Sequence, residues 1–506
     1  EELTNKLFIF CSLRCSANTA DTKANSLGDQ LSAKLSGCAA ANASLRRTVA
    51  GLEDLDAIMD ADPALEPYRF LLESIRRDSK YLLTDREEEL FARMNISGAS
   101  AWETLRDNLT SSVKVEYNGG VTNLSAIRNL AYDPDPDVRK SAYEAELACY
   151  DKIKDSVAFA LNSIKMQVIN ECQVRGYASP LDKALYQSRM KRETLDALLG
   201  AMDEYMPKFW QYLRTKGKAL GHENGLPWYE LFAPMGKSDK KDTTQDAKDY
   251  LLNIFGGFDS QLHDMVERAF DEAWIDFYPR NGKVGGAFDC GVPSARQSRV
   301  LTNFDGAFGD IVTLAHELGH AVHSYLSNRT QPTVYRDYVI FVAEVASTCN
   351  EALLMEHLLQ STQDRRRRAW LLNHFLEQFK GTLYRQTMFA EFELRIGQLT
   401  AQGETLTADL LSREYRALNE DYFGPDMVID DEIALEWARI PHFYYNYYVF
   451  QYATGYSAAI ALSRRILKEG TPAVKDYLGF LSGGCSQDPI DLLRGAGVDM
   501  ASPQPI

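Results

Sequence analysis

Helical periodicity is the feature that most constrains how this chain can fold. Through most of its 506 residues, apolar side chains recur at steps of three and four, and Gly, Pro and Asn interrupt the pattern. This spacing gathers apolar side chains on one face of a helix, so it predicts a mainly α protein. The clearest case begins at Asp133–Pro136, whose cap chemistry predicts a helix from about Asp137 to Arg175 that Gly176 ends.

One segment departs from the helical pattern. Residues 283–304 contain a Gly-Gly-Ala-Phe run at 285–288 and a later β-branched stretch, and together they predict a small β-sheet. A shorter β-like stretch ends near residue 116 and is followed by a turn. We place a domain boundary there, between an N-terminal helical lobe, residues 1–112, and a main domain, residues 113–500.

Composition excludes several classes of partner. The formal net charge of -16 disfavours binding to nucleic acid or an anionic membrane. No apolar run approaches the ~20 residues of a membrane helix, and Glu1 and Glu2 stand where a signal peptide would carry positive charge. The eight cysteines are scattered, as in a reducing compartment. We therefore expect a cytoplasmic protein, and the sequence carries no signal of its oligomeric state.

The most informative segment is 316–320, His-Glu-Leu-Gly-His, which matches the pattern His-Glu-x-x-His. Asp310 is the expected N-cap of its helix. Four residues turn a helix by about 400°, so His316 and His320 stand one turn apart on one face. Two ligands of a tetrahedral Zn²⁺ need this arrangement. Glu317 is then placed to act as general base on water at the metal. The alternative is a buried helix with two incidental histidines.

Two histidines leave a zinc site open, so a third protein ligand is expected. Glu344 follows His320 by 24 positions, lies in a second predicted helix, and has apolar neighbours that argue against exposure. Glu351 shares its helix face and is predicted to orient a ligand histidine by hydrogen bonding. His323 is expected to be a supporting or surface residue. The alternative for Glu344 is an ordinary surface charge.

These motifs resemble the zinc site of the thimet oligopeptidase family, and most closely its oligoendopeptidase F branch. The resemblance implies a mostly helical, two-lobed protein with a deep channel beside a small β-sheet. It implies one Zn²⁺ at the channel floor and cleavage of internal bonds in short peptides. It also implies that residues 113–500 form the catalytic domain and that lobe 1–112 is incomplete at its start. The matching segments are 130–177, 285–288, 316–320, 341–348 and 440–456.

An aromatic segment near the C-terminus extends the resemblance. In the family, a His and two Tyr seven apart stabilise the oxyanion, and His442, Tyr445 and Tyr452 best match them, with Tyr448 as the rival or a substrate contact. Placed on a helix, the three tyrosines lie near one face. Phenol and imidazole donors suit an amide hydrolase because its tetrahedral intermediate carries an oxyanion. The alternative is that the tyrosines pack the core.

The glycine-rich segment is the last candidate site. Glycines let another backbone approach closely, so Gly286 and Ala287 are predicted to hold a substrate strand, although an ordinary bulge would look the same.

Two other functions remain open from the sequence. A zinc exopeptidase that trims C-terminal residues needs a cation for the substrate carboxylate, and Arg439 is near the aromatic segment. A silent peptide-binding protein would lack Glu317 or a ligand, and none is missing.

Overall fold

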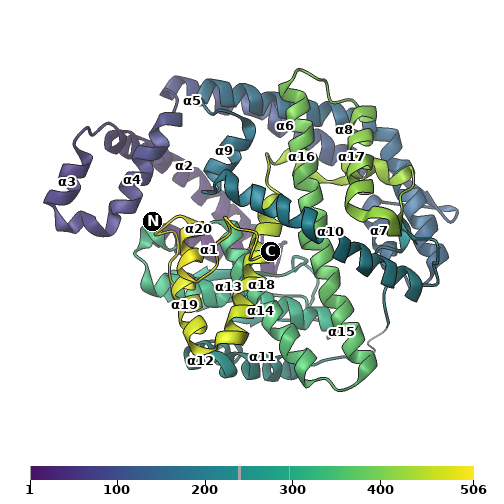
Figure 1. The fold of residues 1–506 in the computed structure, drawn as a ribbon. Helices are drawn as coiled ribbons and strands as arrows, with labels where there is room; N and C mark the ends of the chain where they lie inside the picture. The colour runs from purple at the N-terminus through teal and green to yellow at the C-terminus, as the bar shows by residue number, and fades with distance from the viewer. Residues whose placement is uncertain (1, 237–240, 296) are drawn as a thin grey trace.

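Helices dominate the architecture. The computed structural model describes residues 2–236, 241–295 and 297–506 (Figure 1). In these ranges, strands occur only in small two- and three-stranded sheets, which confirms the prediction of a mainly α protein. None of the described helices combines the length and apolar character that a membrane crossing needs.

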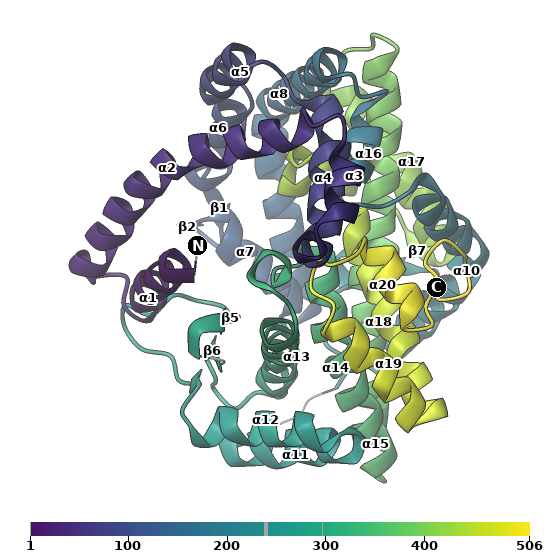
Figure 2. The same cartoon turned by 90° about the vertical axis from the view of Figure 1, so that its left-hand side faces the viewer.

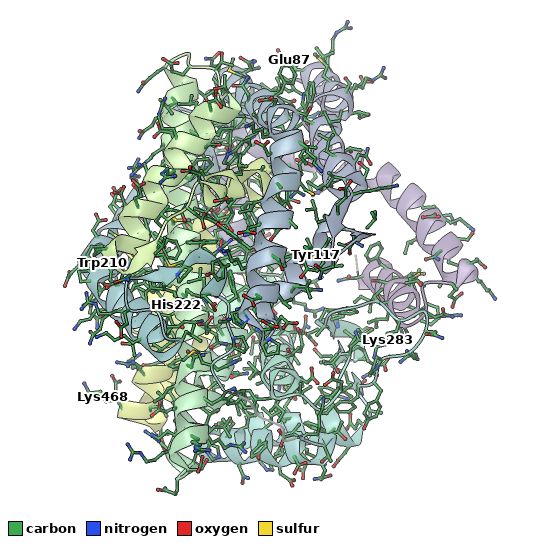
Figure 3. All side chains as sticks on the ribbon, turned by 90° about the vertical axis from the view of Figure 1, so that its right-hand side faces the viewer. Glu87, Tyr117, Trp210, His222, Lys283 and Lys468 are labelled. Carbon is green, nitrogen blue, oxygen red and sulfur yellow. The ribbon has the colours of Figure 1, made fainter. Side chains whose placement is uncertain are left out.

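The N-terminal part of the chain is a set of helices followed by a short β-hairpin. In Figure 2, α2 spans from α1 to α4, and α1 lies beside the strand β5. The C-terminal end of α1 is hydrogen-bonded to the segment that precedes β5, because the Val284 N–H donates to the Ser16 carbonyl over 2.9 Å. Figure 3 shows Lys283 on this connection, next to α1. The elements are α1 Glu2–Ala17, α2 Thr22–Ala50, α3 Leu55–Ala61, α4 Arg69–Asp78, α5 Asp85–Ser97, α6 Ala99–Ser112, β1 Val115–Tyr117 and β2 Gly120–Thr122.

The middle of the chain is organised around one long helix. The prediction of this helix is confirmed as α8, Pro136–Arg175, in which the Asp135 side chain accepts from the Asp137 N–H and Gly176 ends the helix at φ 83°. The neighbouring elements are α7 Leu124–Asn129, α9 Pro180–Gln187, α10 Arg192–Ala219, β3 Leu226–Pro227, α11 Thr244–Phe258, α12 Ser260–Asp271 and β4 Ile275–Asp276.

The C-terminal part carries the remaining helices. Helix α14 packs against both α13 and α18, so these three lie side by side (Figure 1). Elements in this part are α13 Phe308–Thr330, α14 Ile340–Ser361, α15 Arg365–Gln378, a π-helix Phe379–Tyr384, α16 Arg385–Ala401, α17 Ala408–Phe423, β7 Met427–Val428, 3₁₀-helices Glu432–Arg439 and Pro441–Tyr444, α18 Phe450–Glu469, α19 Thr471–Leu481 and α20 Pro489–Gly495.

A three-stranded sheet lies against α13; β5 and β6 fall within residues 283–304, for which the sequence predicts a sheet, whereas β4 lies before that segment. Strand β6, Gln297–Leu301, pairs antiparallel with β5, Phe288–Val292, and parallel with β4, so that β5 is an edge strand. Gly291 in β5 faces α13 closely, because a Cβ there would lie 2.9 Å from the Ser324 Cβ. The glycine therefore lets the strand approach the helix.

The start of α13 differs from the prediction in one respect. The helix begins at Phe308, so Asp310 is not its N-cap but lies in its first turn. The Asp310 carboxylate nevertheless accepts from the backbone N–H groups of Asp305, Gly306 and Ala307 at 2.8–3.1 Å. A side chain in the first turn can reach back in this way, and its negative charge also suits the helix N-terminus.

The contact between α13 and α14 depends on Gly319. A Cβ built at Gly319 would lie 2.6 Å from the Ser347 Cα and 3.0 Å from the Ala346 carbonyl oxygen, so no larger residue fits without a shift of backbone. Because the two helices meet this closely, residues one turn away on α14 come within reach of the His-Glu-x-x-His face of α13.

We expect Gly319→Ala to lower the free energy of unfolding by about 1–3 kcal/mol, as overpacking of a tight contact does. Gly309→Ala is the matched control, since Gly309 is also in α13 and a Cβ there meets nothing within 4 Å. The control should leave stability unchanged or raise it by up to about 1 kcal/mol. Denaturant unfolding measures both, and equal effects of the two variants would contradict this account of the contact.

Candidate metal centre

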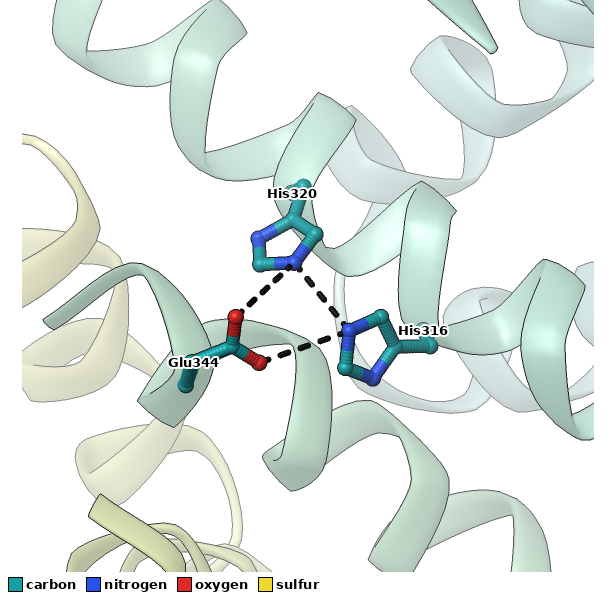
Figure 4. A group of neighbouring side chains, drawn as sticks. All are labelled: His316, His320 and Glu344. Atoms are coloured by element: carbon teal, nitrogen blue, oxygen red, sulfur yellow. Dashed lines mark hydrogen bonds and ion pairs between the residues drawn. The ribbon is translucent and has the colours of Figure 1, made fainter. Parts of the chain in front are cut away.

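Three predicted ligands converge between α13 and α14 (Figure 4). The Nε2 atoms of His316 and His320 are 3.2 Å apart. From α14, the two carboxylate oxygens of Glu344 lie 3.4 Å from the Nε2 of His316 and 3.9 Å from that of His320. One ligand atom from each residue therefore lies within 4.8 Å of the other two. The structure brings together the three side chains that the sequence singled out.

The chemistry of these three groups fits a zinc ion. Two imidazole nitrogens at 2.0–2.1 Å from a tetrahedral metal stand about 3.3 Å apart, close to the separation found between His316 and His320. Burial, together with the neighbouring His316, lowers the pKa of His320 to about 3. His320 is therefore neutral, which is the form that binds a metal.

Glu351 is placed to fix the orientation of His316. Its Oε1 lies 2.6 Å from the Nδ1 of His316. Burial alone would lower the pKa of His316, but the hydrogen bond and charge of Glu351 outweigh burial and leave the pKa raised. When Nδ1 donates its hydrogen to Glu351, Nε2 is left as the nitrogen that faces His320 and Glu344.

Glu317 is buried beside the strand β5. The backbone N–H of Asp289 lies close enough to stabilise the Glu317 carboxylate by hydrogen bonding, and burial raises the pKa of Glu317 to about 7. Among the described residues, its Oε2 has no hydrogen-bond partner. One side of this carboxylate is thus supported by the sheet, and the other oxygen is available to take a proton.

A partly buried polar cluster links β5 to α13. The Asp289 Oδ2 accepts from the hydroxyls of Ser298 and Ser324, each over 3.4 Å, and Ser324 also bonds the Tyr338 hydroxyl over 3.0 Å. The His323 ring stacks on Tyr338 with 3.6 Å between ring centres and is fully buried, so His323 is not a surface residue, and its supporting role stays a prediction. The sequence did not single out Asp289, although it directly follows the Gly-Gly-Ala-Phe run.

The aromatic segment brings His442 and Tyr452 together. The Nε2 of His442 lies 3.2 Å from the Tyr452 hydroxyl. Burial, the neighbouring Tyr448 and the charge of Glu344 all raise the pKa of Tyr452, so its phenol stays protonated and can donate. Tyr448 stacks with His442, and Tyr445 meets the His442 ring edge-on while remaining 49% exposed.

The three tyrosines do not share one helix, the arrangement in which they would lie near one face. A 3₁₀-helix ends at Tyr444, a turn follows, and α18 begins only at Phe450. Within the turn, Tyr447 is buried with a left-handed φ of 49°, and its N–H donates to Glu393 over 3.2 Å. Glu393 pairs with Lys165 over 2.8 Å, and both are buried. This distant ion pair holds the turn, and no local sequence pattern marks it.

Gly286 and Ala287 lie immediately before the edge strand β5. Gly286 is exposed, has a left-handed φ of 79°, and its carbonyl accepts from the Asn303 side chain over 2.9 Å. The two residues therefore form the entry to β5 rather than part of the strand.

Similar proteins are known among both sequences and solved structures. The chain is 38% identical to "Oligopeptidase PepF" of Bacillus subtilis, over 100% of this chain and 76% of that protein. It is 36% identical to "Group B oligopeptidase PepB" of Streptococcus agalactiae, over 87% of this chain and 74% of that protein. A peptidase from Chlamydophila abortus superposes with a TM-score of 0.91 at 29% identity, covering 99% of this chain and 85% of the other. Oligoendopeptidase-F from Enterococcus faecium superposes with a TM-score of 0.75 at 29% identity, covering 99% of this chain and 87% of the other.

A His-Glu-x-x-His helix with a facing glutamate on the next helix is the arrangement of a metallopeptidase. The family model described as "Peptidase family M3" matches residues 243–506, and that described as "Oligopeptidase F" matches residues 50–114. The chain belongs to peptidase family M3, in its oligoendopeptidase F branch, as the resemblance implied. The family is zinc-dependent.

We expect Glu351→Gln to weaken Zn²⁺ binding by about 10- to 100-fold, because loss of the carboxylate removes the partner that orients His316. Glu356→Gln is the matched control: Glu356 lies in the same helix and accepts from Gln360. Competition with a chromophoric chelator measures the dissociation constants. An unchanged affinity in Glu351→Gln would refute the orienting role.

Proposed function

We propose that this chain hydrolyses internal peptide bonds of short oligopeptides, with one Zn²⁺ per chain held by His316, His320 and Glu344. The observation that carries the proposal is the convergence of these three ligands beside Glu317. The names of the relatives, oligopeptidase and oligoendopeptidase, support the substrate class. When bound, Zn²⁺ polarises the scissile carbonyl and makes water acidic enough to attack at neutral pH.

Glu317 is the proton carrier in this proposal. Its unpartnered Oε2 takes a proton from the attacking water and then passes it to the nitrogen of the leaving amine. A pKa raised to about 7 suits both steps, because the same carboxyl must gain the proton and lose it again. The backbone of Asp289 holds the carboxylate in place during the transfer.

Tyr452 and His442 are the proposed stabilisers of the oxyanion. The Tyr452 phenol is protonated and lies within the field of Glu344, so it is close to the ligands. Tyr445 is 49% exposed, which favours Tyr452 as the donor between the two candidates. Tyr448 packs against both His442 and Tyr452 and is proposed to contact substrate.

The proposed substrate path follows the edge strand β5. A peptide can add as a further strand along this edge, entering at Gly286 and Ala287. The end of α1 is bonded to the connection before β5, which supports a role of lobe 1–112 in restricting access through a channel. All of the proposed site residues fall in residues 113–500, the proposed catalytic domain.

Three features bear on the alternatives and on location. Arg439, the cation that an exopeptidase would need, is already paired with Glu146 over 2.8 Å and with Glu436, which favours internal cleavage. The ligands and Glu317 are all present, which argues against a silent binding protein. The described cysteines are free, which supports the proposed cytoplasmic location.

Glu317→Gln should lower kcat by about 10²- to 10⁴-fold, the usual contribution of a general base, and should retain its zinc. An internally quenched peptide and mass analysis of the products measure the rate and show whether cleavage is internal. A chelator should abolish wild-type activity and added Zn²⁺ should restore it. Full activity in Glu317→Gln would mean that another group is the base.

Tyr452→Phe should lower kcat by about 10²- to 10³-fold with a smaller change in KM, because an oxyanion donor acts chiefly in the transition state. Tyr445→Phe removes an equivalent hydroxyl a short distance away and should cost less than about tenfold. Steady-state kinetics on one peptide compares the two variants. The reverse ranking would transfer the oxyanion role to Tyr445.

A further inference from the structure

Glu351 has a second partner besides His316. While its Oε1 faces the His316 Nδ1, its Oε2 accepts from the Nε2 of Gln378 over 2.6 Å. Both carboxylate oxygens are therefore hydrogen-bonded, one to an imidazole on α13 and the other to an amide at the end of α15. A carboxylate held at one oxygen only could rotate about its last bond, whereas one held at both cannot rotate without breaking a bond.

We propose that Gln378 is a positioning residue of the metal centre, which fixes Glu351 and through it the direction of His316. The inference rests on the metal site proposed above. It extends the chain of contacts by one residue, from His316 on α13 through Glu351 on α14 to α15, so that three helices set the direction of one ligand.

Helix α15 packs against the start of α13 through two of its ring side chains. Trp370 and His374, spaced one turn apart on α15, pack edge-on against Phe308 at the start of α13, at 4.8 and 5.4 Å between ring centres. Gln378 follows His374 by four residues, about one helical turn. It therefore lies on the same face of α15, which meets α13 and α14.

A change of helix type follows Gln378 at once. The π-helix begins at Phe379, whose ring packs edge-on against the buried Tyr456 of α18 at 5.1 Å. The wider π turn changes the direction in which consecutive side chains point, and Lys380 donates to the Leu231 carbonyl over 2.8 Å. Ring packing therefore holds the backbone on both sides of Gln378.

The residue types at this position suit the role. Glu377, directly before Gln378, is neutralised by Lys216 and Lys380. Gln378 carries no charge, so its N–H directs Glu351 while leaving the negative charge of that carboxylate to act on His316. A lysine at this position would instead neutralise part of that charge.

The test is the affinity of purified protein for Zn²⁺ in Gln378→Met, which keeps the length of the side chain and removes its donor. Gln386→Met is the matched control, since Gln386 is also half-buried and its Nε2 donates to the Gly381 carbonyl over 3.3 Å. Chelator competition should show about 3- to 10-fold weaker binding in Gln378→Met, less than for a direct partner of the ligand. Gln386→Met should bind as the wild type does.

A double-mutant cycle separates positioning from a general loss of structure. If Gln378 acts through Glu351, adding Gln378→Met to Glu351→Gln should weaken binding by less than about twofold further. Equal losses in both backgrounds, or equal affinities of the Gln378 and Gln386 variants, would overturn the inference while leaving the metal site intact. Zinc binding that survives His316→Ala would instead refute the proposed site, and the inference with it.

Discussion

The close contact between α13 and α14 at Gly319 is the constraint on which the site depends. A second close contact joins α14 to α18, where a Cβ at Gly455 would lie 3.3 Å from the Phe341 carbonyl oxygen. The three helices therefore stack with little space between their backbones. Each contributes a different group: the histidines come from α13, the two glutamates from α14, and the phenol of Tyr452 from α18. Reactive groups mounted on packed helices keep their relative positions better than groups on free loops.

Parts of the site that are not helical are held by backbone bonds and buried charges. The sheet supports Glu317 through a main-chain N–H, and Gly291 lets the strand lie close to α13. The turn after Tyr444 depends on the buried pair Lys165–Glu393, which lies far away in the sequence. Removing one member of such a pair leaves an uncompensated charge in the interior, so the turn and the helices are joined energetically as well as spatially.

The sequence predicted those parts of the site that depend on local spacing. The four-residue step between His316 and His320 implies a shared helix face, and the 24 positions from His320 to Glu344 suit a second helix that returns the carboxylate to the metal. The sequence did not reveal the turn among the tyrosines, because Tyr447 adopts a left-handed backbone and its N–H donates to Glu393, which is distant in the sequence. It missed Gln378 for a similar reason, since a partner of Glu351 on a third helix leaves no local pattern.

On the proposed substrate path, in which a peptide pairs with β5, the edge position of this strand has a consequence for which peptides can be processed. A strand of this kind binds its partner through main-chain N–H and carbonyl groups that are the same for nearly every amino acid. Recognition is then tolerant of side-chain identity, with one chemical exception. Proline has no N–H to offer, so a proline at any substrate position whose N–H must face β5 breaks the pairing. The strand would thus filter peptides by where their prolines fall, independently of the rest of their composition.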